Sequence, residues 1–91
     1  MVTSFKHRGL KELYERGSSA KVRADLKKRI LVRLDVLREA LTLRDLNRPG
    51  FDFHPLRGSP QRYSIHVNGP WCITFEFEEG NALRVDLEQY H

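Results

Sequence analysis

A chain of 91 residues is long enough for one small domain with its own core, and too short for a second. Its composition, 40% hydrophobic and 31% charged, is ordinary for a globular protein, and no apolar run approaches the roughly 18 residues of a membrane span. Residues 1–17 lack the apolar block of a signal peptide, and the single cysteine, Cys72, cannot form an internal disulfide. We therefore expect one cytoplasmic domain, residues 1–91, without a membrane segment or a metal site.

The net charge of +4 is unevenly distributed along the chain. Residues 1–48 contain 13 Lys or Arg against 6 Asp or Glu, a balance of +7, whereas residues 49–91 contain 3 against 6, a balance of −3. A basic excess of this kind fits a nucleic acid, and it fits an acidic protein partner as well. Because helices also carry charge for solvation alone, charge leaves these alternatives open.

The N-terminal half is predicted to be mainly helical. Residues 2–5 form a short β-branched and aromatic run typical of a strand, and residues 10–14 have helical spacing until Gly17, which ends a first helix. Ser18 and Ser19 are candidate caps of a second, longer helix. Its apolar residues recur every three or four positions and predict a stripe that faces a sheet: Val22, Leu26, Ile30, Leu34, Leu37 and Leu41.

The C-terminal half is predicted to form a mainly antiparallel sheet. Residues 42–46 match a capping box with one helical turn, and residues 51–60 are expected to form an ordered loop. Residues 63–77 alternate between apolar and polar side chains around an Asn-Gly-Pro turn, which predicts a hairpin with one buried and one polar face. Residues 83–88 predict a last strand in the same way. The expected fold class is α+β, with two N-terminal helices packed on one face of the sheet and the polar face free to bind.

The polar face and the loop before it contain the groups that a metal-free ribonuclease requires. Such an enzyme needs a base for the 2′-hydroxyl, an acid for the departing 5′-oxygen and cations for the phosphate. Histidine suits either proton role because its unperturbed pKa lies near 6.5. The alternative is a structural role, in which a loop histidine satisfies a backbone group or an outward histidine is merely solvated. The candidates are His54, Arg57, Arg62, Tyr63, His66, Tyr90 and His91.

Several motifs, in their order and spacing, resemble the HigB-type toxins of bacterial toxin–antitoxin pairs, within the RelE-like ribonuclease superfamily. The matching motifs are Ser-Phe-Lys-His and Gly-Leu-Lys near the N-terminus, Leu46-Asn47-Arg48, His54-Pro55-Leu56-Arg57-Gly58, Trp71-Cys72-Ile73-Thr74-Phe75 and Tyr90-His91. The resemblance implies a small RelE-like domain that cleaves messenger RNA in the ribosomal A site by general acid and base catalysis, with no metal or cofactor. It also implies a cognate HigA-type antitoxin, through which alone the toxin reaches operator DNA.

The resemblance assigns catalytic roles to four residues. His54 matches the loop histidine that transfers a proton, and Arg57 matches the loop cation that contacts phosphate. Tyr90 and His91 match the C-terminal pair. We expect these four side chains to converge at the polar face, and we expect an acidic antitoxin to cover the basic residues 1–48. The substrate-binding candidates are Arg62, His66 and Arg84.

Two positions depart from the family pattern. The family strand commonly reads Trp-Arg-Ile, and Cys72 stands where that arginine stabilises the scissile phosphate, while Gln89 replaces the aspartate of the family tail. Alternation places Cys72 in solvent-accessible space on the polar face, where a neutral thiol cannot replace a bidentate cation. We expect Cys72→Arg to raise cleavage unless a neighbouring arginine such as Arg62 already fills that space. Two hypotheses follow: an endonuclease toxin, fully active or attenuated, or a catalytically silent module that binds the antitoxin and regulates the operon.

Overall fold

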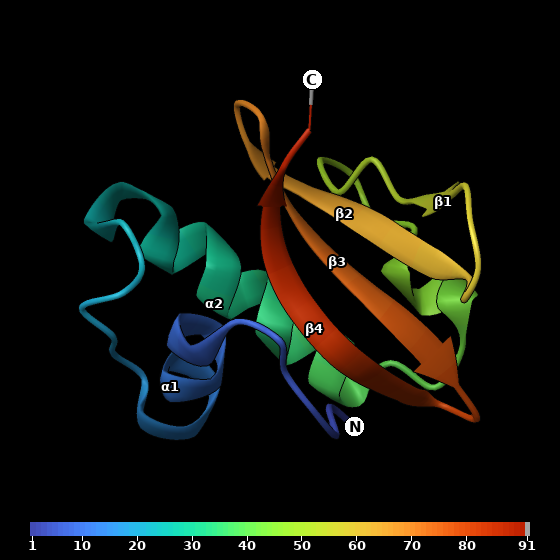
Figure 1. The fold of residues 1–91 in the computed structure, drawn as a ribbon, viewed down its shortest axis with the longest axis horizontal. Helices are drawn as coiled ribbons and strands as arrows, with labels where there is room; N and C mark the ends of the chain where they lie inside the picture. Colours follow the sequence, from blue (N-terminus) through green and yellow to red (C-terminus); the bar gives the residue numbers. More distant parts are fainter. Residues whose placement is uncertain (91) are drawn as a thin grey trace.

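The computed structural model describes residues 1–90, in which two α-helices precede a four-stranded antiparallel sheet (Figure 1). In chain order the elements are α1 (Arg8–Arg16), α2 (Ala24–Glu39), the 3₁₀ turn η1 (Leu43–Leu46), β1 (His54–Leu56), β2 (Arg62–Asn68), β3 (Trp71–Glu78) and β4 (Asn81–Gln89). Each strand pairs with the next one along the chain. The predicted α+β class is confirmed, and none of the helices within residues 1–90 is both long and apolar enough to cross a membrane.

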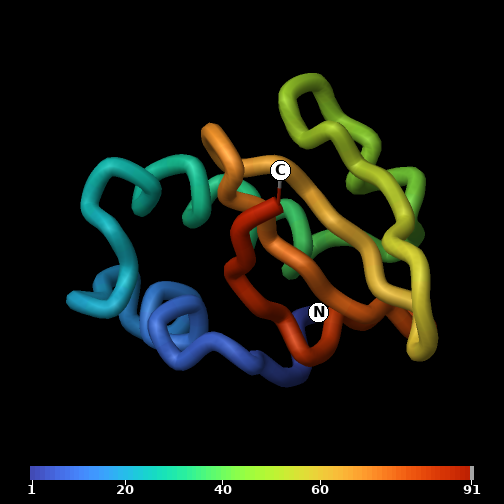
Figure 2. Tube along the Cα trace, turned by 45° about the horizontal axis from the view of Figure 1, so that its top comes forward, coloured from blue at the N-terminus to red at the C-terminus, as the bar shows by residue number. Residues whose placement is uncertain are grey.

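The N-terminal segment and α1 lie against β4. Helix α1 begins after His7, whose Nδ1 accepts a hydrogen bond from the Leu10 N–H (3.2 Å), and it ends as predicted at Gly17, which has a φ of 78°. Val2 and Phe5 make isolated parallel bridges to β4, and in Figure 2 this segment runs beside the C-terminal strand. The predicted first strand is therefore only a pair of bridges.

Helix α2 packs its apolar face on the sheet but is shorter than predicted. It begins at Ala24, because Ser19 Oγ donates to Glu12 (2.7 Å) and accepts from the Lys21 N–H (3.1 Å) instead of capping this helix. The helix ends at Glu39, because the capping box of η1 captures the next free backbone N–H groups. Leu41, which was predicted to end the apolar stripe, consequently lies beyond the helix and is 76% exposed. The core side chains on α2 are Leu26, Ile30, Leu34, Val36 and Leu37.

The predicted hairpin and last strand are confirmed, with the helices on one face only. In Figure 1 the sheet lies in front of α2, and the face toward the helices contains the fully buried Ile65, Ile73 and Phe75. We call the opposite face, which no helix covers, the open face. Its side chains are Arg62, Ser64 and His66 on β2, Cys72, Thr74 and Glu76 on β3, and Leu83, Arg84, Asp86 and Glu88 on β4. Leu83 was predicted to face the core, but the irregularity between β3 and β4 pairs it with Glu76.

The expectation of a loop over residues 51–60 is wrong in part, since three of these residues form the edge strand β1. His54 pairs with Ser64, and Leu56 pairs with Arg62. Pro55 lies in the middle of this strand, where a proline is tolerated because an edge strand needs backbone N–H groups on one side only. The strand thereby adds His54 to the open face.

Candidate active site

Strand register arranges the side chains of the open face in rows. Directly paired residues of neighbouring antiparallel strands point to the same side of a sheet. His54 is therefore held by β1 beside Ser64 of β2, in a position that depends on pairing and not on closeness in sequence. The row that crosses all four strands consists of His54, Ser64, Thr74 and Asp86.

Two arginines on this face share one carboxylate. Arg84 donates from Nε and Nη2 to the two Glu76 carboxylate oxygens, each at 2.6 Å, and Arg62 donates from Nη1 to Oε2 at 3.2 Å. The Glu76 side chain is only 6% exposed, and the Arg84 guanidinium holds the pKa of its carboxyl below the ordinary value. An ionised Glu76 thus holds two guanidinium groups side by side, leaving one net positive charge.

Arg62 is the more firmly positioned of the two. Its Nη2 donates to Thr74 Oγ1 (3.1 Å) and to the backbone carbonyl of Arg84 (3.0 Å), and its side chain is 17% exposed against 52% for Arg84. Thr74 donates its own proton to Glu88, so its hydroxyl orientation is set from both sides. Arg62 therefore presents a preorganised guanidinium over β3, two residues from Cys72.

Tyr90 follows β4 and lies on the same side as this network. Its backbone N–H donates to the Pro70 carbonyl (2.7 Å), which anchors it to the hairpin turn. Partial burial raises the pKa of the Tyr90 phenol, Glu88 raises it further and Arg62 opposes both. The phenol is consequently protonated at neutral pH and available as a hydrogen-bond donor.

The His54 ring is held in one tautomer. Its Nδ1 lies 2.8 Å from the Asp52 carbonyl oxygen, and because a carbonyl can only accept, Nδ1 must carry the proton. In the neutral ring the lone pair is then on Nε2, which forms no hydrogen bond among the described residues, as a general base requires. His66 is held in the opposite tautomer, since its Nε2 donates to the Gly69 carbonyl at 3.0 Å in the hairpin turn.

The structure brings most of the predicted site residues to the open face. His54, Arg62, His66 and Arg84 project from its strands, and Tyr90 lies within electrostatic reach of Arg62. Arg57 is exposed in the loop just after β1 and has no hydrogen-bond partner among the described residues. His91 lies outside the described residues, so its convergence with His54 stays a prediction.

Cys72 faces the open side, as predicted, but the expectation that it is accessible to solvent is wrong. Cys72 is only 7% exposed and is paired with His66 on one side and Glu88 on the other. Tyr90 lies near enough for Cys72 to raise the pKa of its phenol. Alternation along a strand predicts the direction of a side chain, whereas the neighbours on flanking strands decide its burial. An arginine at this position would have to displace those neighbours.

The sequence interpretation missed three polar residues of this network. Thr74, Glu76 and Glu88 alternate toward the polar face, but their role depends on which cations lie opposite them. That pairing depends on the register of β2, β3 and β4, including the irregularity between Thr74 and Glu76. The one available signal was the presence of Glu76 between two phenylalanines in the strand.

Glu76 should make stability depend on acid pH. Because its pKa is lower in the folded protein than the ordinary value of about 4.3, its contribution is fully present above about pH 5 and is lost as the pH falls through the folded pKa. We expect thermal unfolding of the wild type to show this loss as the pH falls below about 5, and Glu76→Gln to flatten the profile and lower Tm at pH 7. A profile identical to that of the wild type would contradict the ionic role of Glu76.

The Ser64 hydroxyl is buried without a hydrogen-bond partner among residues 1–90. Ser64→Ala removes no native bond, so we expect the free energy of unfolding to stay unchanged or rise by up to about 1 kcal/mol. Thr74→Val is the matched control, since it removes a hydroxyl that makes two bonds and should cost about 1–3 kcal/mol. Urea titration measures both, and a clear loss in Ser64→Ala would reveal a bond that the structure lacks.

Comparison with known proteins places this geometry in a family. The family model described as the RelE-like toxin of type II toxin–antitoxin system HigB matches residues 3–91. The Endoribonuclease HigB of Proteus vulgaris is 42% identical over 92 residues, an alignment that covers 100% of both chains. The chain therefore belongs to the HigB-like family of RelE-like toxins of type II toxin–antitoxin systems.

Proposed function

We propose that this toxin is an endoribonuclease that cleaves messenger RNA in the ribosomal A site. The observation that supports this most strongly is the open face itself. There His54 lies one row from Arg62, and Arg62 and Arg84 share the Glu76 carboxylate. The name of the Proteus vulgaris relative supports the same class of reaction. The loop that follows β1 adds Arg57 as a further exposed cation, three residues after His54.

The proposed chemistry is transfer of the phosphoryl group to the neighbouring 2′-oxygen. His54 Nε2 takes the proton of the 2′-hydroxyl, the 2′-oxygen bonds to phosphorus, and the bond to the 5′-oxygen breaks after that oxygen gains a proton. Tyr90 and His91, the next residue in the sequence, are the proposed source of this proton. Arg62 and Arg84 stabilise the charge that develops on the phosphate.

Arg62 is proposed to take over the role of the arginine that Cys72 replaces. Its guanidinium approaches β3 from the neighbouring strand and is held in place by Glu76 and Thr74. A cation held before the substrate arrives needs little reorganisation when charge develops, which is the condition for strong electrostatic catalysis. Loss of the family arginine from β3 is therefore compatible with activity.

Family membership implies an antitoxin partner. We propose that it is a HigA-type protein that covers part of the basic residues 1–48, neutralises the toxin and alone contacts operator DNA. The ribosome is the proposed site of action, and we accordingly propose that the toxin acts in the cytoplasm.

The test is induced expression with and without the antitoxin gene, together with mapping of new 5′ ends on cellular messages. Growth arrest with new 5′ ends inside reading frames, both abolished by the antitoxin, is the expected result. Purified ribosomes with a defined message then test ribosome dependence, and cleavage of the free message at the same rate would contradict it. If cells that express the chain alone grow normally, and the chain still binds the antitoxin, the catalytically silent module is favoured.

A further inference from the structure

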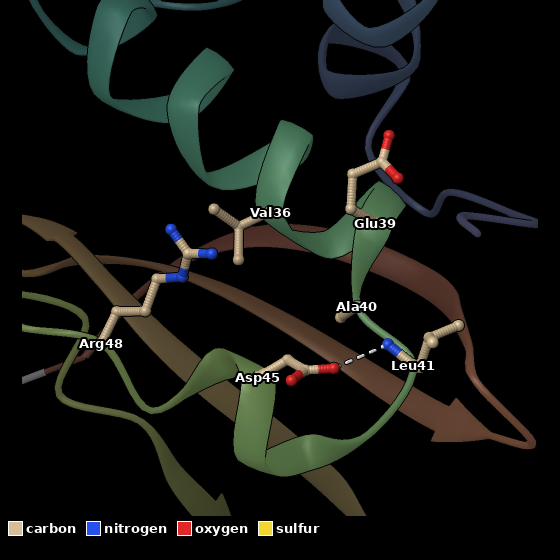
Figure 3. A pocket seen from close by; sticks show the side chains of 6 residues that line it. All are labelled: Val36, Glu39, Ala40, Leu41, Asp45 and Arg48. Carbon is tan, nitrogen blue, oxygen red and sulfur yellow. Dashed lines mark hydrogen bonds between the residues drawn. The ribbon is translucent and has the colours of Figure 1, made fainter.

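The end of α2 and the turn η1 form a hollow of about 250 Å³ on the helix-covered side of the sheet. Val36 and Ala40 supply its buried apolar floor, and Leu41 lies at its rim with 76% of its surface exposed. Figure 3 shows Asp45 bonded to the Leu41 backbone at one side and Arg48 extended toward Val36 at the other. The hollow thus combines an apolar floor with a cation at its edge.

The apolar surface continues along α2 beyond the hollow. Val32 precedes Val36 by four residues, so the two side chains lie on one face of the helix, and Val32 is 51% exposed. We call Val32, Val36, Ala40 and Leu41 the α2–η1 strip. Two exposed large apolar side chains at the two ends of one strip mark a surface suited to a protein partner.

Two of the three acidic groups along the α2–η1 strip, Asp35 and Asp45, are held by close contacts within the protein. Arg38 pairs with Asp35 at 2.9 Å and with Glu39 at 3.7 Å. The Asp45 carboxylate accepts from the N–H groups of Leu41 (2.9 Å) and Thr42 (3.1 Å), which hold its pKa below the ordinary value. Asp35 and Asp45 consequently offer little charge to a partner, whereas Glu39 remains 81% exposed beside the hollow.

The cations beside the strip have no such partners. Lys28 and Arg29 lie one helical turn before Val32, and Arg48 lies at the hollow. None of the three forms an ion pair among the residues that the structure describes. Against these three cations stands the exposed carboxylate of Glu39, so the balance of available charge next to the apolar strip is positive. This balance is complementary to a segment that combines apolar and acidic side chains.

We propose that the α2–η1 strip docks an amphipathic acidic segment of the antitoxin, with an apolar side chain in the hollow and a carboxylate on Arg48. This inference deepens the proposed function by naming a surface for its partner. The strip is built from elements on the helix-covered side, so the bound segment leaves the open face uncovered. An RNA partner would use the same cations but would gain little affinity from Leu41. The effect of replacing Leu41 therefore distinguishes a protein partner from RNA.

The test measures antitoxin affinity by calorimetry, with all toxin variants in a His54→Ala background so that they can be produced. We expect Leu41→Asp and Arg48→Glu each to weaken binding at least about tenfold, because each removes a central contact. Lys11→Glu on α1 is the matched control for charge reversal, and we expect it to weaken binding less than about threefold. An unchanged Tm shows that each variant folds. We expect this result because Leu41 and Arg48 are exposed in the native structure.

Cleavage on ribosomes by Leu41→Asp and Arg48→Glu with His54 intact is expected to stay within about twofold of wild type in the absence of antitoxin. Wild-type affinity in both variants would overturn the docking surface. So would reduced cleavage by Arg48→Glu with unchanged antitoxin affinity, because that result assigns the strip to RNA. If the wild-type toxin cleaves no message but Leu41→Asp still weakens antitoxin binding, the proposed nuclease activity is refuted and the docking surface is supported.

Discussion

Replacement of His54 by alanine is expected to lower the rate of message cleavage on ribosomes by about 10²–10⁴, the usual contribution of a general base. The Asp52 carbonyl fixes the proton on Nδ1 and leaves Nε2 free, and the ring is exposed on the edge strand, where a substrate reaches it. Single-turnover cleavage of a defined message, with ribosomes in excess, measures the chemical step. Because His54 makes no core contact, Tm should be unchanged.

His66→Ala is the matched control for His54. Both histidines project from the open face, but the His66 ring is bonded through Nε2 to the Gly69 carbonyl and supports the hairpin turn. We expect its removal to cost less than about tenfold in rate. Equal losses in the two variants, or a His54→Ala toxin within about tenfold of wild type, would remove His54 from the role of base.

Replacement of Arg62 by alanine is expected to lower the same rate by about 10²–10³, as removal of one preorganised donor does elsewhere. Arg62→Lys should recover only part of this loss, because an ammonium group cannot reproduce the fork that contacts Glu76 and Thr74. Arg62→Ala also leaves Glu76 with one cation fewer, so its Tm is measured beside its rate. A loss of rate in Arg62→Lys with a wild-type Tm isolates the electrostatic effect from stability.

Cys72→Arg distinguishes a relocated cation from a missing one. Since Cys72 is buried and Arg62 already lies over β3, we expect no gain in cleavage, and overpacking at this position should cost about 1–3 kcal/mol of stability. An active wild type, an inactive Arg62→Ala and no gain in Cys72→Arg would show that the function has moved to β2. An inert wild type that Cys72→Arg activates would instead identify a silenced toxin.

Much of the fold could be predicted because its signals are local. The alternation over residues 63–77 has a period of two, which needs no knowledge of the rest of the chain to predict a two-faced hairpin. Gly17 ends α1, and the capping box of residues 42–45 opens η1, for the same reason. The histidines and arginines of the site were recognised by type and by their match to a family, which is also information held in the sequence.

Tertiary structure decided what depends on contacts between distant residues. The strand β1 has three residues and a central proline, so it exists only because β2 supplies its hydrogen bonds. The start of α2 depends on Ser19 bonding to Glu12, seven residues earlier in another helix. Both outcomes are set by partners whose position a linear pattern does not contain.

The sequence by itself determined the fold class, the two faces of the hairpin and the residue types available for catalysis, because these follow from side-chain chemistry and short-range periodicity. Only the tertiary structure decided that Cys72 is buried and that Glu76 holds Arg62 beside Arg84. Burial and ion pairing depend on the register of neighbouring strands and on the irregularities within it, where a shift of one residue turns a side chain to the other face.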